Sequence, residues 1–230
     1  MKYYAIIVAG GSGKRMHSAV PKQFLQLNGI PVLMHTINAF HSCKTKPDII
    51  VVLHPNSHTL WHELCEEHQF TVPHQLVSGG ETRFHSVRNG IALIGDDDSV
   101  VAIHDAVRPL VNKEIIDESF ECAEQYGNGI VAIKSRDSVR QIRDNRSVSL
   151  NRDEIYLIQT PQTFRAGQLK NAYQQPYQES FTDDASVVEQ TGVNINLISG
   201  SYQNIKITYP EDIAIAEFLL REHPLPFRPA

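Results

Sequence analysis

The stretch YYAIIVAGGSGKRM, residues 3–16, decides the fold class of this chain. Its first half, residues 3–9, is continuously apolar and rich in β-branched side chains, which is typical of a strand buried on both faces of a sheet. A loop with three glycines and two cations follows at once. Glycines let backbone N–H groups converge on an anion, so the stretch predicts a strand that leads into a phosphate-binding loop.

Two well-known nucleotide motifs do not fit this loop. A Walker A loop needs Ser or Thr after Lys14 and glycine at position 8, where the chain has Arg15 and Val8. A dinucleotide fingerprint needs Gly or Ala where Met16 stands, which argues against an NAD-dependent oxidoreductase. We therefore expect a phosphate loop of another type that includes Gly13, and the alternative is a plain glycine turn.

Further apolar runs extend the pattern along the chain. Residues 49–53, 100–103 and 130–133 read as buried strands, and amphipathic segments lie between them. This alternation predicts an α/β protein with an open, mostly parallel, twisted sheet flanked by helices on both faces. At 230 residues the chain suits a single domain, residues 1–230.

Three segments carry clear helix signals. Residues 32–40 place Leu33, Ile37 and Phe40 on one face. Residues 113–126 stop at Gly127, in the position of a C-terminal cap. The last helix is expected after Thr208-Tyr209-Pro210-Glu211, which has the pattern of a capping box with proline near the first helical position.

Charge and composition restrict the partners and the compartment. A net charge of −5 argues against general affinity for nucleic acid, although a small anionic substrate needs only a local cluster of cations. No apolar run reaches the roughly 20 residues that span a bilayer, and the first residues do not read as a signal peptide, so we expect no membrane contact and a cytoplasmic location. Three widely spaced cysteines do not predict disulfides.

One segment, residues 138–158, breaks the alternation. Residues 138–143 and 147–158 are two polar, extended stretches joined by a turn-like break at 144–146. We interpret the segment as a protruding β-arm. A polar hairpin is marginal alone, so we expect it to rest on a second copy of the chain in a homodimer. The tail at 224–230 is proline-rich and is expected to be extended.

The strongest metal-ligand candidate is Asp105, which follows the buried run 100–103 in the sequence HDAVRP. Ligands of open α/β sheets bind at the carboxyl ends of strands, and one carboxylate suffices for Mg²⁺ when substrate phosphates supply other oxygens. The alternative is that Asp105 only caps a helix. A third cation, Lys22, follows Arg15 by seven residues and is expected to face the same phosphates.

Two other polar clusters are assigned structural roles. Asp96-Asp97-Asp98 precedes a strand, whereas the acidic metal motif of glycosyltransferases would follow one, so a solvated turn is expected. The histidines near Trp61 lack the second ligand of a metalloprotease motif, because Glu66 stands four residues after His62. That segment is expected to be an ordinary surface helix.

With AGGSGKRM, PKQ and HDAVRP, the chain resembles the 2-C-methyl-D-erythritol 4-phosphate cytidylyltransferases of the non-mevalonate isoprenoid pathway. The likeness continues in GGETRFHSV at 79–87, TPQTF at 160–164, TDDAS at 182–186 and NIKIT at 204–208. The set in this order covers nearly the whole chain. It implies a mixed sheet of the nucleotidyltransferase type, a β-arm exchanged in a homodimer, and transfer of CMP from CTP to methylerythritol phosphate with release of pyrophosphate.

The resemblance also implies roles for individual residues. Arg15, Lys22 and Lys206 would be catalytic cations, and Asp105 would hold Mg²⁺. The nucleotide pocket would contain Ala9, Gly10, Gly11, Gly13, Gly80, Glu81, Ser86 and Ala106. The second substrate would meet Arg108, Ser138, Arg152, Thr182 and Lys206, with Arg152 supplied by the other subunit. Departures from the family pattern at Gly10, Ser138 and Glu81 keep the required chemistry.

Two other functions stay open at this point. Ribitol-5-phosphate cytidylyltransferase would have the same fold and reaction with a pentitol substrate. A nucleotide-binding regulatory module without turnover would need neither Lys22 nor Asp105. The expected chemistry itself needs no general base, because the second pKa of a phosphate monoester is about 6 and the attacking group is largely anionic at neutral pH. Cations and Mg²⁺ would instead offset repulsion between the phosphates.

Overall fold

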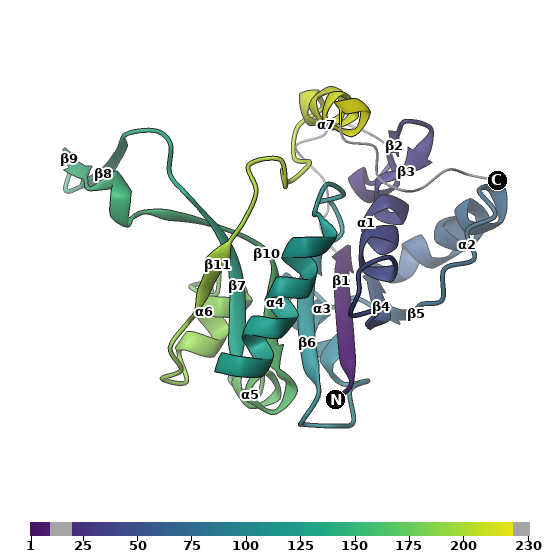
Figure 1. The fold of residues 1–230 in the computed structure, drawn as a ribbon, viewed down its shortest axis with the longest axis horizontal. Helices are drawn as coiled ribbons and strands as arrows, with labels where there is room; N and C mark the ends of the chain where they lie inside the picture. The colour runs from purple at the N-terminus through teal and green to yellow at the C-terminus, as the bar shows by residue number, and fades with distance from the viewer. Residues whose placement is uncertain (10–19, 223–230) are drawn as a thin grey trace.

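The structure is a computed structural model that describes residues 1–9 and 20–222, with no account of the Glu222 side chain. At its centre lies a seven-stranded sheet with the order β11-β7-β10-β6-β1-β4-β5 (Figure 1). Its strands are β1 (Tyr3–Ala9), β4 (Asp48–Leu53), β5 (Gln75–Ser78), β6 (Val100–Asp105), β7 (Asn128–Lys134), β10 (Tyr156–Arg165) and β11 (Leu197–Ser199). The helices are α1 (Val32–His41), α2 (His58–Glu67), α3 (Arg83–Ile91), α4 (Lys113–Tyr126), α5 (Ala166–Ala172), α6 (Asp184–Glu189) and α7 (Glu211–Glu222).

The sheet is mixed, as predicted. β1 pairs in parallel with β4 and β6, β4 with β5, and β7 with β11. β10 runs antiparallel to both of its neighbours, β6 and β7. A single long strand thus joins the two parallel halves of the sheet.

Helices cover both faces of the sheet, and the side chains of β1 show why. Ile7 belongs to a core cluster with α1, α2 and α4, whereas Ile6 belongs to a cluster with α3, α5 and α6. Both side chains are fully buried. Alternate side chains of a strand point to opposite faces, so the continuously apolar run at 3–9 is what a two-sided core requires. In the described part of the chain, no helix is both long enough and apolar enough to cross a membrane.

The predicted helix signals hold with one difference. Leu33, Ile37 and Phe40 are fully buried, and Gly127 ends α4 with a φ of 92°. At α7, however, the side chain that reaches back to the backbone is that of Asp212, which accepts hydrogen bonds from the N–H groups of Thr208 and Tyr209. The expected partner, Glu211, is one residue too early for this geometry.

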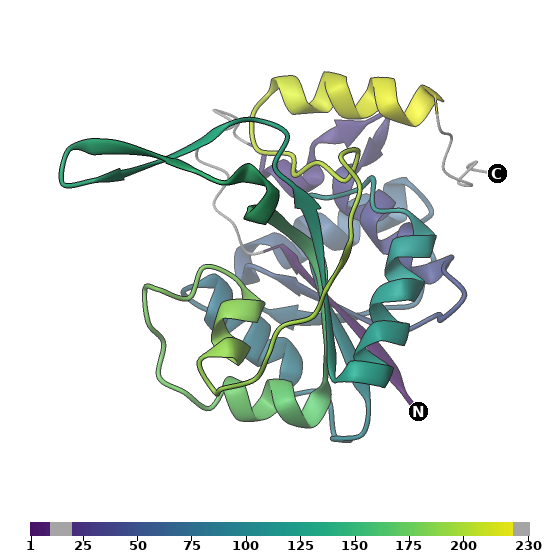
Figure 2. The ribbon, with the colours of Figure 1, turned by 60° about the vertical axis from the view of Figure 1, so that its left-hand side comes forward.

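The polar segment forms a hairpin that projects away from the sheet (Figures 1 and 2). β8 (Val139–Arg143) pairs antiparallel with β9 (Arg146–Leu150), and both residues of the turn between them have positive φ. The expectation that residues 147–158 are one stretch of the arm is wrong. After β9 comes a short 3₁₀ turn at Arg152–Glu154, and the apolar residues 156–158 already belong to β10, paired with β7.

Two short strands and α7 form a third packing cluster beside the sheet. β2 (Gln26–Leu27) and β3 (Ile30–Pro31) pair antiparallel, and Leu27 packs in one cluster with Val107, Ile207 and Ala216. This cluster joins the segment after Lys22 to the segment after Lys206. Two cation-bearing segments far apart in the sequence are therefore fixed to one another by apolar contacts.

Candidate active site

Several of the residues singled out in the sequence meet at the carboxyl edge of the parallel strands. Ala9 ends β1, Asp105 ends β6, and Gly79 follows β5, with its N–H donating to the carbonyl of Leu53 at the end of β4. This edge is where open α/β sheets bind ligands. Two pockets adjoin there. The first is lined by Val8, Ala9, Lys22, Gln23, Glu81, Thr82, Arg83, Asp105, Val107 and Lys206. The second is lined by Arg83, Asp105, Arg108, Ile158, Gln159, Thr160, Gln162, Thr182, Asp183 and Lys206.

Asp105 is the electrostatic centre of the site, because three cations of the described part of the chain contact its carboxylate. Lys206 Nζ lies 2.8 Å from Oδ2, Arg108 Nε lies 3.6 Å from Oδ2, and Arg83 Nε lies 3.4 Å from Oδ1. The carboxylate is largely buried, with 10% of the side chain exposed. Burial favours the protonated form, but Arg83, Lys206 and Arg108 outweigh it and hold the pKa of Asp105 well below its usual range. Asp105 is therefore ionised at neutral pH.

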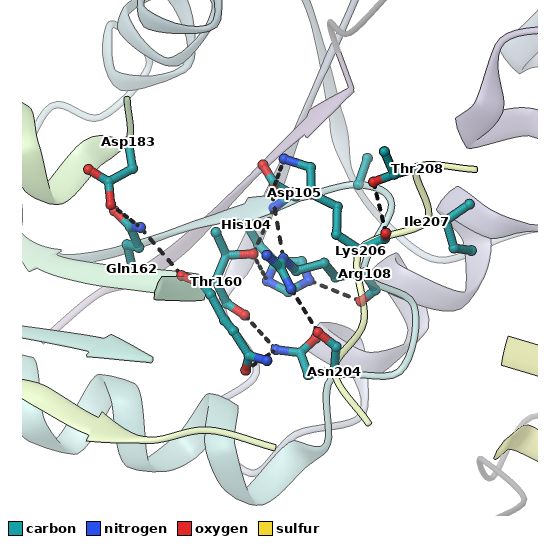
Figure 3. A network of polar contacts seen from close by, with 12 residues as sticks. His104, Asp105, Arg108, Thr160, Gln162, Asp183, Asn204, Lys206, Ile207 and Thr208 are labelled. Carbon is teal, nitrogen blue, oxygen red and sulfur yellow. Dashed lines mark hydrogen bonds and ion pairs between the residues drawn. The ribbon is translucent and has the colours of Figure 1, made fainter. Parts of the chain in front are cut away.

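A chain of hydrogen bonds behind Asp105 fixes its backbone (Figure 3). His104 Nε2 lies 3.2 Å from the carbonyl of Arg108, which can only accept, so Nε2 carries the proton. Burial lowers the pKa of His104 to about 3, so the ring is neutral and its Nδ1 accepts from the Thr160 hydroxyl at 3.0 Å. Thr160 Oγ1 in turn accepts from the N–H of Asp105 at 3.1 Å. The donor and the acceptor of each of these three hydrogen bonds are thus assigned.

Asn204 connects three of the sequence motifs on the other side of the site (Figure 3). Its side-chain amide donates to the carbonyl of Thr160 at 2.9 Å, and its backbone carbonyl accepts from Nη1 of Arg108 at 2.7 Å. Asn204 is fully buried. HDAVRP, TPQTF and NIKIT are thereby joined through one buried residue, Asn204.

Lys22 lies on a short 3₁₀ turn, Lys22–Phe24, that hydrogen-bonds to two other segments of the site. The buried Gln23 amide donates to the carbonyl of Ala9 at 3.0 Å. Lys22 Nζ donates to the carbonyl of Ile207 at 3.1 Å, beside Lys206. The end of β1 and the segment of Lys206 are thus linked through adjacent residues.

The loop from Gly79 to Thr82 requires glycine for close packing. A Cβ on Gly80 would lie 2.5 Å from Cβ of His85, closer than two carbons can approach. The N–H of Gly80 donates to Ser86 Oγ at 3.1 Å, and the Ser86 hydroxyl donates to the carbonyl of Thr82 at 2.9 Å. Thr82 caps α3 by accepting from the N–H of His85. Ser86 therefore shapes the loop that carries Glu81 into the first pocket.

The structure brings together many of the predicted site residues. Ala9, Lys22, Glu81, Asp105 and Lys206 line the first pocket, and Asp105, Arg108, Thr182 and Lys206 line the second. Ala106 is fully buried, and its N–H donates to the carbonyl of Val8. Gly10, Gly11, Gly13 and Arg15 lie outside the described residues.

Two predicted substrate contacts lie elsewhere. Ser138 and Arg152 are exposed, at the start of the hairpin and on the turn after it, and neither lines these two pockets. Nη1 of Arg152 is 3.4 Å from the carbonyl of Arg136 in the same chain. Their assignment to the second substrate stays a prediction that needs another subunit.

Sequence reasoning assigned no role to several residues that organise the site. Arg83, Thr160 and Asn204 all lie inside motifs that carry the family resemblance, which was the available signal. Their function depends on partners such as Asp184, 101 positions from Arg83. Such pairings become visible only when the chain is folded.

The side chains at the site determine which divalent metal it could hold. Among the described residues, no group of three His, Cys, Asp or Glu side chains gathers to hold an ion. Of the residues that the structure describes, Asp105 alone presents a carboxylate at both pockets. This arrangement suits Mg²⁺, which commonly binds through one or two carboxylates plus substrate phosphates and water.

Known proteins match this chain over almost its entire length. The family model for 2-C-methyl-D-erythritol 4-phosphate cytidylyltransferase matches residues 3–222. A protein of that name from Bacteroides thetaiotaomicron is 48% identical over 220 residues, 96% of this chain and 100% of the relative. The crystal structure of 4-diphosphocytidyl-2C-methyl-D-erythritol synthase from Anaerococcus prevotii superposes with a TM-score of 0.82 at 30% identity, over 96% of each chain.

A second solved structure agrees with the first. The 2-C-methyl-D-erythritol 4-phosphate cytidylyltransferase of Francisella tularensis has a TM-score of 0.77 at 33% identity and covers 95% of this chain and 99% of its own. Sequence motifs, sheet order and pocket position thus agree with full-length relatives. This chain belongs to the 2-C-methyl-D-erythritol 4-phosphate cytidylyltransferase family.

Proposed function

We propose that this chain transfers CMP from CTP to 2-C-methyl-D-erythritol 4-phosphate, giving 4-diphosphocytidyl-2-C-methyl-D-erythritol and pyrophosphate. Family membership supports the reaction. The observation that carries the proposal in this chain is the junction of two pockets at Asp105, ringed by Arg83, Arg108 and Lys206. Two phosphorylated substrates repel one another, and cations at the point where they meet offset that repulsion.

The proposed reaction balances without a base. A phosphate oxygen of the second substrate forms a bond to the α-phosphorus of CTP, and the bond from that phosphorus to the bridging oxygen breaks. The electron pair leaves with pyrophosphate. Lys22, Lys206 and Arg15 would stabilise charge that builds up on the α-phosphate, and the fixed geometry would hold both phosphates in line.

Magnesium, the subunit arrangement and the compartment are part of the proposal. Asp105 would hold Mg²⁺, which would supply charge neutralisation at the phosphates. The first pocket, with Ala9 and Glu81, would receive CTP, and the second, with Arg108 and Thr182, would receive methylerythritol phosphate. The hairpin would join two copies in a homodimer, and the enzyme would work in the cytoplasm.

A substrate panel with pyrophosphate release as the readout tests the proposal. CTP, UTP, ATP and GTP are each offered with methylerythritol phosphate and with ribitol phosphate, in Mg²⁺ and after chelation. The expected result is turnover with CTP, methylerythritol phosphate and Mg²⁺. Equal or faster turnover of ribitol phosphate would reassign the second substrate. Binding of CTP without pyrophosphate release from any pair would indicate a regulatory module.

A further inference from the structure

Within residues 1–9 and 20–222, three residues line both pockets: Asp105, Lys206 and Arg83. The proposed function gives Asp105 and Lys206 individual roles, whereas it counts Arg83 only as one of the cations around Asp105. A guanidinium at the wall that two phosphate-binding pockets share is well placed to affect the reaction, so its contacts decide what it can do.

Arg83 is held by a second carboxylate, that of Asp184. Nη1 lies 2.8 Å from Oδ1 and Nη2 lies 2.6 Å from Oδ2, which is a bidentate pair. Asp184 is fully buried, and the Tyr173 hydroxyl donates to its Oδ1 at 2.6 Å. With both terminal nitrogens occupied, Arg83 turns its Nε towards Asp105 Oδ1 at 3.4 Å.

The other two cations around Asp105 are held differently. Lys206 has one flexible ammonium, and 41% of its side chain is exposed, so it can turn towards a phosphate. Arg108 donates to a backbone carbonyl through Nη1, and its buried Nε has no hydrogen bond to any described residue. Among the three, only Arg83 is clamped between two carboxylates.

We propose that Arg83 is a positioning residue that keeps the Asp105 carboxylate at the junction of the two pockets when Lys206 turns to substrate phosphates. Asp184 begins α6, two residues after Thr182. The Asp184–Arg83–Asp105 connection therefore also sets the distance between the segment of Thr182 in the second pocket and the carboxylate that both pockets share. This inference rests on the proposed function, because it concerns the geometry of that reaction.

Two conservative substitutions separate positioning from charge. Arg83→Lys keeps the positive charge, but one ammonium cannot replace a fork that spans two carboxylates. Asp184→Asn keeps the shape and removes the charge that clamps Arg83. Each is expected to lower kcat by about 10- to 100-fold, the usual effect of losing a supporting contact, with the Kd for CTP changed by less than about threefold. The double variant should be little worse than either single one, because both break one connection.

A matched control is Arg165→Lys. Arg165 is also partly buried, and its guanidinium donates to the carbonyl of Glu124, away from both pockets. Calorimetry with CTP gives the number of competent sites in every variant. The expected result is a normal number of CTP sites with reduced kcat in the Arg83 and Asp184 variants, and normal kcat in the control.

Specific results would overturn the inference. One is that Arg83→Lys has a kcat per CTP-binding site within twofold of that of wild type. The other is that the variants lose activity only in proportion to the number of CTP-binding sites that they lose. If Arg83→Lys does not fold, Tyr173→Phe removes one hydrogen bond from Asp184, and kcat should fall by about threefold or more; an unchanged kcat contradicts the inference. An inactive wild-type chain would overturn the proposed function and this inference together, whereas an active one with a normal Arg83→Lys overturns only the inference.

Discussion

The charge of Asp105 affects the three cations around it, because the carboxylate lies between them. Lys206, Arg108 and Arg83 share this one carboxylate, which lies largely out of water. Substrate phosphates that enter either pocket would compete with Asp105 for the same cations. Among the described residues, the carboxylate contacts these side chains, whereas the N–H of Arg108 in the turn that follows donates to the backbone carbonyl of Asp105, so helix capping does not account for the carboxylate.

Replacing Asp105 tests this centre. Asp105→Asn keeps the size and removes the charge, and we expect turnover to fall on the order of 100-fold, without recovery at higher Mg²⁺. Pyrophosphate release against Mg²⁺ concentration measures it. Asp97→Asn is the matched control, because Asp97 also pairs with a lysine, Lys170, but at an exposed site. Near-normal activity of Asp105→Asn would contradict the metal-binding role.

Lys22 should act mainly on the rate of the chemical step. In Lys22→Ala we expect kcat to fall by about 100-fold and the Kd for CTP to rise by less than about tenfold, because charge on the α-phosphate is greatest in the transition state. Single-turnover kinetics and calorimetry separate the two constants. Lys170→Ala, which removes a lysine paired with Asp97, serves as the control. A weaker Kd with unchanged kcat would show that Lys22 only binds substrate.

At the scale of elements, α1 is joined to the β2–β3 hairpin by one buried histidine. His35 Nε2 lies 2.8 Å from the carbonyl of Leu27, so Nε2 donates and the ring can stay neutral. Burial lowers the pKa of His35 below its ordinary value, although the backbone hydrogen bonds act in the opposite direction. The hairpin that follows Lys22 therefore depends on a histidine that resists protonation.

This histidine predicts a pH dependence of stability. Because the folded pKa is the lower one, the unfolded chain binds the extra proton first, and the free energy of unfolding falls as the pH drops below about 6.5. The loss from one such site is at most about 1.4 kcal/mol per pH unit. Urea unfolding at pH 7.5 and 5.5 should show a smaller loss in His35→Gln than in wild type. His41→Gln, at an exposed position of the same helix, should lose as much as wild type; equal losses in all three would refute the assignment.

The elements themselves were largely predictable, because local patterns determine them. Strands such as residues 3–9 are apolar throughout, and Gly127 marks a helix end by its backbone freedom alone. The end of the arm was misplaced at Ile158, although residues 156–158 are apolar, because polar residues flank them on both sides. Their pairing with β7 is a long-range contact that the local sequence does not show.

The site was predictable only in part, for a different reason. Asp105 and Lys22 stand out because their charges follow strand or loop signals. Arg83 looks like an ordinary surface residue until the buried Asp184 is brought to it from another helix. Asn204 likewise acts through Thr160 and Arg108, which only the folded sheet places nearby. Long-range polar pairs leave no periodic trace in a sequence.

At the scale of the whole molecule, the prominent feature is the β8–β9 hairpin, which projects away from the sheet (Figures 1 and 2). Arg152 is exposed on the turn after β9, and it lines neither described pocket. Exposed Ile142 and Val148 lie on the paired strands β8 and β9. An isolated two-stranded hairpin is marginal in water, so these features favour support from a second copy.

Complementation tests whether Arg152 acts in the other subunit. Lys22→Ala and Arg152→Ala homodimers should each be poorly active. After subunit exchange, half of the dimers are mixed, and one of their two sites has neither defect, so activity should recover to roughly a quarter of wild type. Mass spectrometry confirms the exchange. No recovery after complete exchange would leave Arg152 with a role inside its own subunit.

The place of β10 in the sheet has a consequence for how the chain is made. β6 is complete at Asp105, but the strand that pairs with its free edge is β10, which ends at Arg165. Until about 60 further residues have left the ribosome, the edge of β6 in the β5-β4-β1-β6 half stays unpaired and apolar. β7 and β11 cannot cover this edge, because they join the sheet only through β10. Chains released early in this window should therefore aggregate or bind chaperones, whereas chains released after β10 should not.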